Sequence, residues 1–331
     1  MRTVKKLLRS LLDGERLDAV RRLRARWLRP GAYRYDGQRF MAASSAGRRC
    51  DDEERLSAHI VKDFHSIEKG LALPKPRALF GRGVVARLMA NVAAYESAYG
   101  ASKVTSRARD ALTAYVARND ESQLPELCRF LSSGTPAERA EAGVDTVSKA
   151  QLFPCDTAAA RRFLESRRSV RNFTGQAVPE ETIREVIGIA QRVPSVCNRQ
   201  SARVFATTDP ATMKEVLSYQ NGNRGFGETL GAVFVVASDL RAFTTIGERN
   251  QPWVDGGIFA MGLVNALHAA QLGACMLNWS VEPERDRAMR RRFGIGDHYA
   301  VITMIGAGYV PETFQVAMSP RRDIDKVVSF L

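Results

Sequence analysis

The spacing of apolar residues changes character near the middle of the chain. Between residues 51 and 150, apolar positions recur every three or four residues, as on amphipathic helices, with prolines and glycines between the segments. Two more helices are predicted at 157–166 and 179–193. Strand-like runs then occur at 203–207, 232–237, 275–279 and 299–305. The pattern predicts a helical region followed by a region that mixes helices with a sheet.

One predicted helix, 253–272, is apolar on nearly every face. It is rich in small residues, namely Gly256, Gly257, Ala260, Gly262 and Ala266. A helix of this kind must be buried on all sides, and small side chains let another helix approach closely. We therefore expect this helix at a dimer interface.

The first 30 residues form a basic segment. They contain ten Lys or Arg and three acidic residues, so they carry +7 of the net charge of +13. Their apolar positions recur at helical spacing with a break near Gly14, which predicts a basic amphipathic helix. Residues 31–50 show little periodicity and several glycines and serines, and they predict a linker or an extended arm. We expect four parts: residues 1–30, a linker at 31–50, a helical region at 51–150 and a domain at 157–331.

Three roles are open to the basic segment. The pattern favours a helix that packs on its own domain and turns its basic face to solvent. The second interpretation is peripheral contact with an anionic membrane surface. Nucleic-acid binding ranks last, because no ribonucleoprotein pattern, zinc knuckle or helix-turn-helix accompanies the charge.

Composition narrows the class of protein. With 331 residues, 45% hydrophobic and 26% charged, the chain resembles an ordinary globular protein. Its longest apolar runs, 231–237 and 299–308, fall short of the roughly 20 residues of a membrane span. Near the N-terminus, Arg9 interrupts the apolar stretch 7–12 and no small-residue cleavage site follows, so this stretch does not resemble a secretory signal. Five scattered cysteines without a CxxC pair indicate reduced thiols. We expect a cytoplasmic protein, with the inner membrane face as the alternative for the basic segment.

A possible metal pair occurs at residues 65–70, where His65 and Glu68 are three residues apart. On a helix both side chains would share a face, but no further ligand follows at helical spacing. We therefore predict no metal site there and a hydrogen-bonded helix end before Gly70.

Two short runs carry candidate chemistry. Residues 167–171 place three guanidinium groups and a hydroxyl beside a predicted helix end, which suits bidentate binding of a phosphate. Residues 194–200, Pro-Ser-Val-Cys-Asn-Arg-Gln, begin 23 residues after Arg171 and offer a hydroxyl and amides to the polar edge of a planar heterocycle. Taken singly, the first run is more typical of a solvated surface and the second of a turn.

In this order, the two runs and the strand after them resemble the FMN-dependent nitroreductase family, in an extended form with an N-terminal helical region. The resemblance covers about residues 157–331. It implies an α+β nitroreductase-like fold, with a central, mostly antiparallel sheet flanked by helices, in a domain-exchanged homodimer and preceded here by an all-helical region. It also implies that the flavin phosphate and ribityl chain are bound by Arg167, Arg168, Ser169, Arg171 and Arg321.

The same resemblance assigns the residues around the flavin ring. Pro194, Ser195 and Asn198 would contact it from the partner subunit, Asn223 would lie near its pyrimidine side, and Ser280 belongs to the loop near N5. Two runs depart from the family pattern. Residues 200–202 are Gln-Ser-Ala where the family has Gln-Pro-Trp, and residues 278–283 lack the usual Pro-x-Glu-Gly-like turn. The substrate side of the ring is therefore altered.

The activity implied by the resemblance is an FMN-dependent oxidoreductase. NADH or NADPH would give a hydride to flavin N5, and a small organic acceptor, such as a nitroaromatic, a quinone or a related electrophile, would receive it in a ping-pong cycle. No side chain is assigned as catalytic, because the cofactor performs the hydride chemistry.

Two other functions stay open at this point. One is a flavin-binding, non-catalytic or membrane-surface accessory protein. Extended family members that share the His-Ser-Ile-Glu-Lys-Gly run at 65–70 occur with polysaccharide-biosynthesis genes. The other is a thiazoline/oxazoline-type oxidase, also FMN-dependent, in which the helical region would recognise a peptide.

Overall fold

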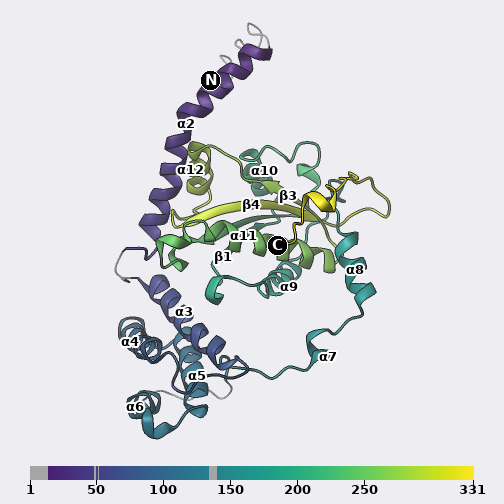
Figure 1. Cartoon of the computed structure of the whole chain (residues 1–331). Coiled ribbons are helices and arrows are strands. Elements are labelled where there is room, and N and C mark those ends of the chain that lie inside the picture. Colours follow the sequence, from purple (N-terminus) through teal and green to yellow (C-terminus); the bar gives the residue numbers. More distant parts are fainter. Residues whose placement is uncertain (1–13, 48–49, 51, 134–139) are drawn as a thin grey trace.

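A long helix, a helical region and a helix-flanked sheet follow one another along the chain (Figure 1). The computed structural model describes residues 14–47, 50, 52–133 and 140–331. The N-terminal helices are α2 (Gly14–Ala43), α3 (Glu53–Leu71), α4 (Arg82–Tyr99), α5 (Lys103–Ala117) and α6 (Pro125–Ser132). A short α7 (Lys149–Leu152) then leads to α8 (Thr157–Ser166).

The sheet has four strands in the order β1-β2-β4-β3, and every neighbouring pair is antiparallel. All four strands coincide with the predicted strand-like runs to within a few residues, which confirms those predictions. Their bounds are β1 (Ala202–Thr207), β2 (Ala232–Asp239), β3 (Gly273–Asn278) and β4 (Tyr299–Gly308). The register shifts between Val236 and Ala237, whose partners are Thr303 and Val301, so Ile302 is the extra residue of a bulge in β4. The antiparallel sheet flanked by helices confirms the predicted α+β fold class.

Helices cover both faces of this sheet, as Figure 1 shows. Alternate residues of β2 point to opposite faces, so Phe234 and Val236 pack with α9 (Glu180–Ala190) and α11 (Gln251–Ala269). Val233 and Val235 pack on the other face with α10 (Pro210–Ser218) and α12 (Pro283–Arg292). Because both faces are covered, β2 is an almost continuous apolar run.

Helix α11 differs in part from its prediction. Its small residues serve packing inside the chain: a Cβ on Gly256 would lie 2.4 Å from the Ile302 side chain, and one on Gly262 would lie 2.4 Å from Val193. The helix is not buried on all sides, because four large apolar side chains are exposed on it: Trp253, Val254, Ile258 and Met261. The close approach that small residues permit is therefore made to β4 and to the end of α9.

The predicted linker at 31–50 is wrong for residues 31–43, which continue α2. Tertiary contacts outweigh the weak helical pattern and Pro30 there. Phe40 and Ala43 are buried with Phe243, and Tyr35 donates a hydrogen bond to Asp286 of α12. Residues 1–13, the first half of the predicted basic segment, lie outside the described residues.

Helices α3 to α6 share a hydrophobic core of their own, separate from the cores of the sheet. The prediction of helix through residue 150 is wrong for 140–148, which are irregular and lead to α7. The predicted helix end before Gly70 is wrong by two residues, because α3 continues through Gly70 to Leu71. The ring of His65 hydrogen-bonds Glu68 at 3.0 Å. Helix α3 also packs against residues 196–198 and 240–242 of the sheet region. No helix in the described parts of the chain is long and apolar enough to cross a membrane.

Candidate functional site

The basic run 167–171 begins where α8 ends and lies beside the edge strand β3. Ser169 forms a parallel bridge with Ala274, and the N–H of Val170 donates to the carbonyl of Ala274 at 3.0 Å. Val170 is buried, whereas Arg168, Ser169 and Arg171 are exposed. The buried valine therefore fixes the backbone and leaves the polar side chains at the surface, where Arg168 Nη1 donates to the carbonyls of Glu165 and Arg167.

Arg167 and Arg168 line a cavity of about 410 Å³ between α8, α11 and the segment after β4. None of the described residues that line it carries a carboxylate. Burial, together with the charge of Arg167, lowers the pKa of His268 in its wall, and the His268 ring hydrogen-bonds Ser166 at 2.8 Å. Apart from Gln271, the remaining wall is apolar and includes Val310. The donor set fits a phosphate ester, since guanidinium N–H groups match phosphate oxygens and no anion competes.

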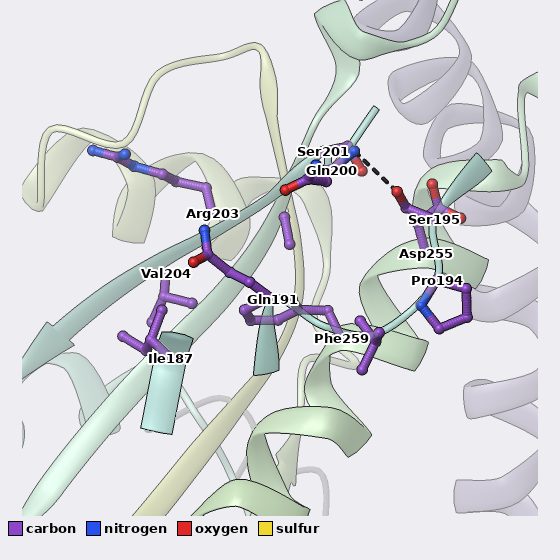
Figure 2. Close-up of a pocket in the computed structure, with 12 residues that line it drawn as sticks. Ile187, Gln191, Pro194, Ser195, Gln200, Ser201, Arg203, Val204, Asp255 and Phe259 are labelled. Atoms are coloured by element: carbon purple, nitrogen blue, oxygen red, sulfur yellow. Dashed lines mark hydrogen bonds between the residues drawn. The ribbon is translucent and has the colours of Figure 1, made fainter. Parts of the chain in front are cut away.

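The run 194–200 forms a tight loop before β1 with three non-glycine residues in the left-handed region. The φ angles of Cys197, Asn198 and Gln200 are 48°, 53° and 49°. Asn tolerates this region but Cys and Gln rarely adopt it, and backbone strain of this kind persists only where surrounding contacts impose it. Here Ser195 Oγ accepts the N–H of Gln200 at 3.0 Å, the dashed bond in Figure 2.

A carboxylate on α11 holds the start of this loop. Both oxygens of Asp255 accept the N–H of Val196, at 3.3 and 3.2 Å, and Gln251 Nε2 donates to Asp255 Oδ1 at 2.8 Å. Asp255 is 4% exposed, so α11 sets the position of the loop through a buried bond. The residues before Asn198 are thus fixed to the same helix that carries the exposed apolar face.

A buried ion pair holds the end of the loop. The guanidinium of Arg199 bonds the carboxylate of Glu248 and also donates to the carbonyl of Ala242 at 2.8 Å. Burial raises the pKa of Glu248, but hydrogen bonds from Arg199 and from the backbone of Thr244 outweigh it, so the pKa lies below its ordinary value. Neither Arg199 nor Asp255 could be predicted as a site residue from the sequence, because their partners are 49 and 59 residues away and no pattern marks them.

The loop borders a cavity of about 180 Å³, shown in Figure 2, together with α9 and β1. Its polar lining includes Ser195, Gln200, Arg203 and Asp255, and Phe259 closes one side. A second cavity, of about 380 Å³, begins at the same residues 200–203 and extends to α3 and α4, where Glu54 and Tyr95 line it. Residues of the helical region therefore reach the surroundings of the loop.

The other expected site residues lie elsewhere. Asn223 borders a cavity of about 390 Å³. Its amide nitrogen donates to the carbonyl of Leu217 at 2.9 Å, so this side chain holds the segment after α10 in place. Ser280 is exposed after β3, and its N–H donates to Asn278 Oδ1 at 3.2 Å. Arg321 is exposed and donates to the carbonyl of Ser319.

Within one chain the predicted residues are not gathered in one cavity. Arg167 and Arg168 line the cavity beside α8, Pro194 and Ser195 line the cavity beside β1, and Asn223 lines a third. A ligand that touches all these groups must therefore contact residues of more than one chain, or the chain must adopt a different conformation that brings the three cavities together.

Comparison with known proteins adds to this geometry. The model of the Nitroreductase family matches residues 164–220, a segment that contains both the basic run and the loop 194–200. Over these residues the chain resembles the nitroreductase family. The family match lies wholly inside the sheet region and includes neither α2 nor the helices α3 to α6.

Individual relatives align with the same region. A protein of Thermus thermophilus named NADH dehydrogenase is 29% identical over 178 residues, which cover 44% of this chain and 84% of that protein. A solved structure from Bacillus subtilis, named as a nitroreductase, is 17% identical, covers 53% of this chain and all of that one, and superposes with a TM-score of 0.48. Another solved structure, also named as a nitroreductase, from Desulfovibrio desulfuricans in complex with FMN, is 21% identical. The match covers 53% of this chain and 96% of that one, with a TM-score of 0.45.

Proposed function

We propose that the protein is an FMN-dependent oxidoreductase that uses NADH or NADPH and a small organic acceptor. The observation that carries this proposal is the family match at 164–220, because it contains the phosphate-type basic run and the Pro-Ser-x-x-Asn loop together. The relative named NADH dehydrogenase supports a reduced nicotinamide as the electron donor. The chemistry supplied by bound FMN is hydride exchange between that donor and the acceptor.

The chain's own residues would bind and orient the cofactor. Arg167, Arg168, Ser169, Arg171 and Arg321 would hold its phosphate and ribityl chain. The cavity beside α8, with guanidinium groups and no carboxylate in its described wall, supports the phosphate assignment. Asn198 and Ser195 would meet the polar edge of the ring, because Asp255 and Arg199 fix their loop from both ends. Asn223 would lie near the pyrimidine side of the flavin ring, and Ser280 would belong to the loop near N5.

The complete site requires a homodimer. Val254, Ile258 and Met261 are spaced by four and three residues, so they form one exposed apolar face of α11. The same helix holds the loop 194–200 through Asp255. A second copy packed on this face would bring its loop 194–200 towards the basic run of the first, which joins groups that lie apart in one chain.

The first experiment is an absorption spectrum of the purified protein before and after anaerobic addition of NADH or NADPH. We expect flavin bands that bleach with the nicotinamide. An Arg168→Ala variant should keep the fold and lose FMN affinity. The control Arg162→Ala, on the exposed surface of α8, should keep both the fold and the FMN affinity. Protein that stays colourless after FMN addition would refute the proposal, and flavin bands that never bleach would leave only the non-catalytic alternative.

Peripheral contact with an anionic membrane surface is a second proposal, for α2. Its C-terminal half packs on the sheet region, but Val20, Leu23 and Trp27 are exposed at helical spacing, among the exposed Arg22 and Arg26. Full-length protein should cosediment with vesicles that contain phosphatidylglycerol, and Leu23→Glu with Trp27→Glu should abolish this. Met41→Glu, on the packed half of the same helix, is the matched control. Equal cosedimentation of both variants would exclude this role.

A further inference from the structure

A second cationic cavity lies where the C-terminal half of α2 meets α12. Its volume is about 580 Å³, which lies in the range of ligand pockets. Four elements supply the arginines that line it: Arg39 from α2, Arg55 from α3, Arg241 from the 3-10 turn Leu240–Ala242, and Arg287, Arg290 and Arg291 from α12. Asp297 is the one carboxylate among the described lining residues. Such a concentration of one sign of charge attracts anions.

Carboxylates and carbonyls in and behind the cavity wall hold several of these guanidinium groups in place. Arg241 binds Asp239 at 2.6 Å, and Arg290 binds Asp286 at 2.9 Å and Asp297 at 2.5 Å. Arg39 donates to the carbonyl of Asp297 at 3.2 Å. These groups are therefore fixed before a ligand arrives, which lowers the entropic cost of binding.

Arg287 and Arg291 have the most donor capacity left. They are four residues apart and so share a face of α12. The one ion pair of Arg287 among the described residues is a 3.8 Å contact with Glu284, and its guanidinium lies 4.5 Å from the centre of the Tyr35 ring. In the described parts of the chain no carboxylate pairs with Arg291, which is exposed. Tyr35 thus helps to orient one of the two groups towards the cavity.

The helix dipole explains some of this charge, since cations are favoured in the last turn of a helix such as α12. Carboxylates of the chain account for the arginines of α2, α3 and the turn 240–242, since Arg39 lies 3.5 Å from Asp286, Arg55 3.0 Å from Asp52 and Arg241 2.6 Å from Asp239. Arg287 and Arg291 are the groups left to meet a ligand with several anionic oxygens, because planar guanidinium groups bind phosphate oxygens in pairs.

We propose that this cavity binds a phosphorylated ligand with at least two negative charges, with Arg287 and Arg291 as its direct donors. A soluble phosphate monoester and the phosphomonoester headgroup of an anionic phospholipid share this chemistry. The cavity has no lining residue in common with the cavity beside α8 that is assigned to the FMN phosphate. The proposal therefore stands independently of the proposed oxidoreductase function.

Titration of the full-length protein with inorganic pyrophosphate in a calorimeter tests the site. We expect saturable binding that Arg287→Ala with Arg291→Ala weakens about tenfold or more, while the corresponding double lysine variant loses less. Arg292→Gln is the matched control, because Arg292 is on the same turn but pairs with Glu215 outside the cavity. Arg168→Ala should also bind normally, which separates this cavity from the one beside α8.

Three results would overturn the proposal: no binding by the wild-type protein, equal binding by the double alanine variant, or loss of binding in Arg168→Ala alone. Circular dichroism checks that the double variant folds. If the double variant does not fold, the single variant Arg291→Ala, at an exposed position, gives a second test. Vesicles then identify the source of the phosphate. A headgroup site requires that pyrophosphate releases the protein from vesicles that contain phosphatidic acid, whose phosphomonoester carries up to two negative charges, and that the double alanine variant fails to bind them. A site for a soluble ester leaves vesicle binding unchanged in both experiments.

Discussion

Arg199 and Glu248 join the loop 194–200 to the segment that leads into α11. The side chain of Arg199 is 1% exposed, and its Nη1 lies 3.1 Å from Glu248 Oε2. The same guanidinium lies over the ring of Phe243, 5.6 Å from its centre, and Phe243 in turn packs with Phe40 of α2. One buried cation thus links the candidate ligand loop, the entry to α11 and the N-terminal helix.

Removal of this cation should destabilise the fold strongly. Arg199→Ala leaves the carboxylate of Glu248 without its partner in a mostly buried position, which typically costs about 3–5 kcal/mol of unfolding free energy. Urea unfolding of the variant and the wild type measures this. The matched control is Arg184→Ala, since the pair Arg184–Glu180 is more than three-quarters exposed and should contribute about 0.5 kcal/mol or less. Equal losses in both variants would show that the buried pair has no special role.

The same pair predicts a pH dependence of stability. The pKa of Glu248 is below its ordinary value of 4.5 in the folded protein, so ionised Glu248 stabilises the fold above that value. This contribution is lost as the pH falls through the lowered pKa. Glu248→Gln cannot ionise, and its stability difference from the wild type should therefore shrink between about pH 5 and pH 3. Unfolding curves at several pH values measure the difference, and a constant difference would contradict the assignment.

Much of the sheet region could be predicted from the sequence because its signals are local. The strand β2 is apolar throughout, and α9 carries Pro179 and two glutamates at its start, so each element is marked by its own residues. The basic run and the loop 194–200 were found because their residues are close together in the chain. Asp255 and Arg199 were not, because they act through partners far away in sequence.

The N-terminal part shows the opposite case. Glycines and Pro30 in residues 30–37 argue against a helix locally, yet α2 continues because Tyr35, Arg39 and Phe40 bind α12 and the start of β4. The cationic cavity is equally hidden from sequence, since its arginines are spread from residue 39 to residue 291. Charge at a site is visible in a sequence only when its residues are neighbours.

Two glycines provide opposite tests of the packing. A Cβ on Gly231, at the start of β2, would lie 2.2 Å from the carbonyl oxygen of Gln176, and the backbone of Gly308 is 3.3 Å away. Gly231→Ala should therefore lower the unfolding free energy by about 1–3 kcal/mol. Gly188 lies inside α9, and a methyl group added there would have no neighbouring atom within 4 Å, so Gly188→Ala should raise the unfolding free energy by about 0.5–1 kcal/mol. Thermal unfolding compares both variants, and a shift of the same sign in both would contradict the described packing.

The exposed face of α11 gives the most direct test of the shared site. Ile258→Arg places a charge in the middle of the face formed with Val254 and Met261, where a second copy would have to bury it. We expect the variant to sediment as a monomer and to lose FMN affinity, because the proposed site takes the loop 194–200 from the partner. Its circular dichroism should remain that of the wild type, since position 258 is already exposed in one chain.

The control for this variant is Leu73→Arg, an exposed apolar position just after α3 and outside the sheet region. It adds the same charge and should change neither sedimentation nor FMN binding. Two results would separate the dimer from the flavin site. A monomeric Ile258→Arg protein that still binds FMN with wild-type affinity would show that one chain holds a complete flavin site, whereas a variant that remains dimeric would show that the subunits meet on another surface.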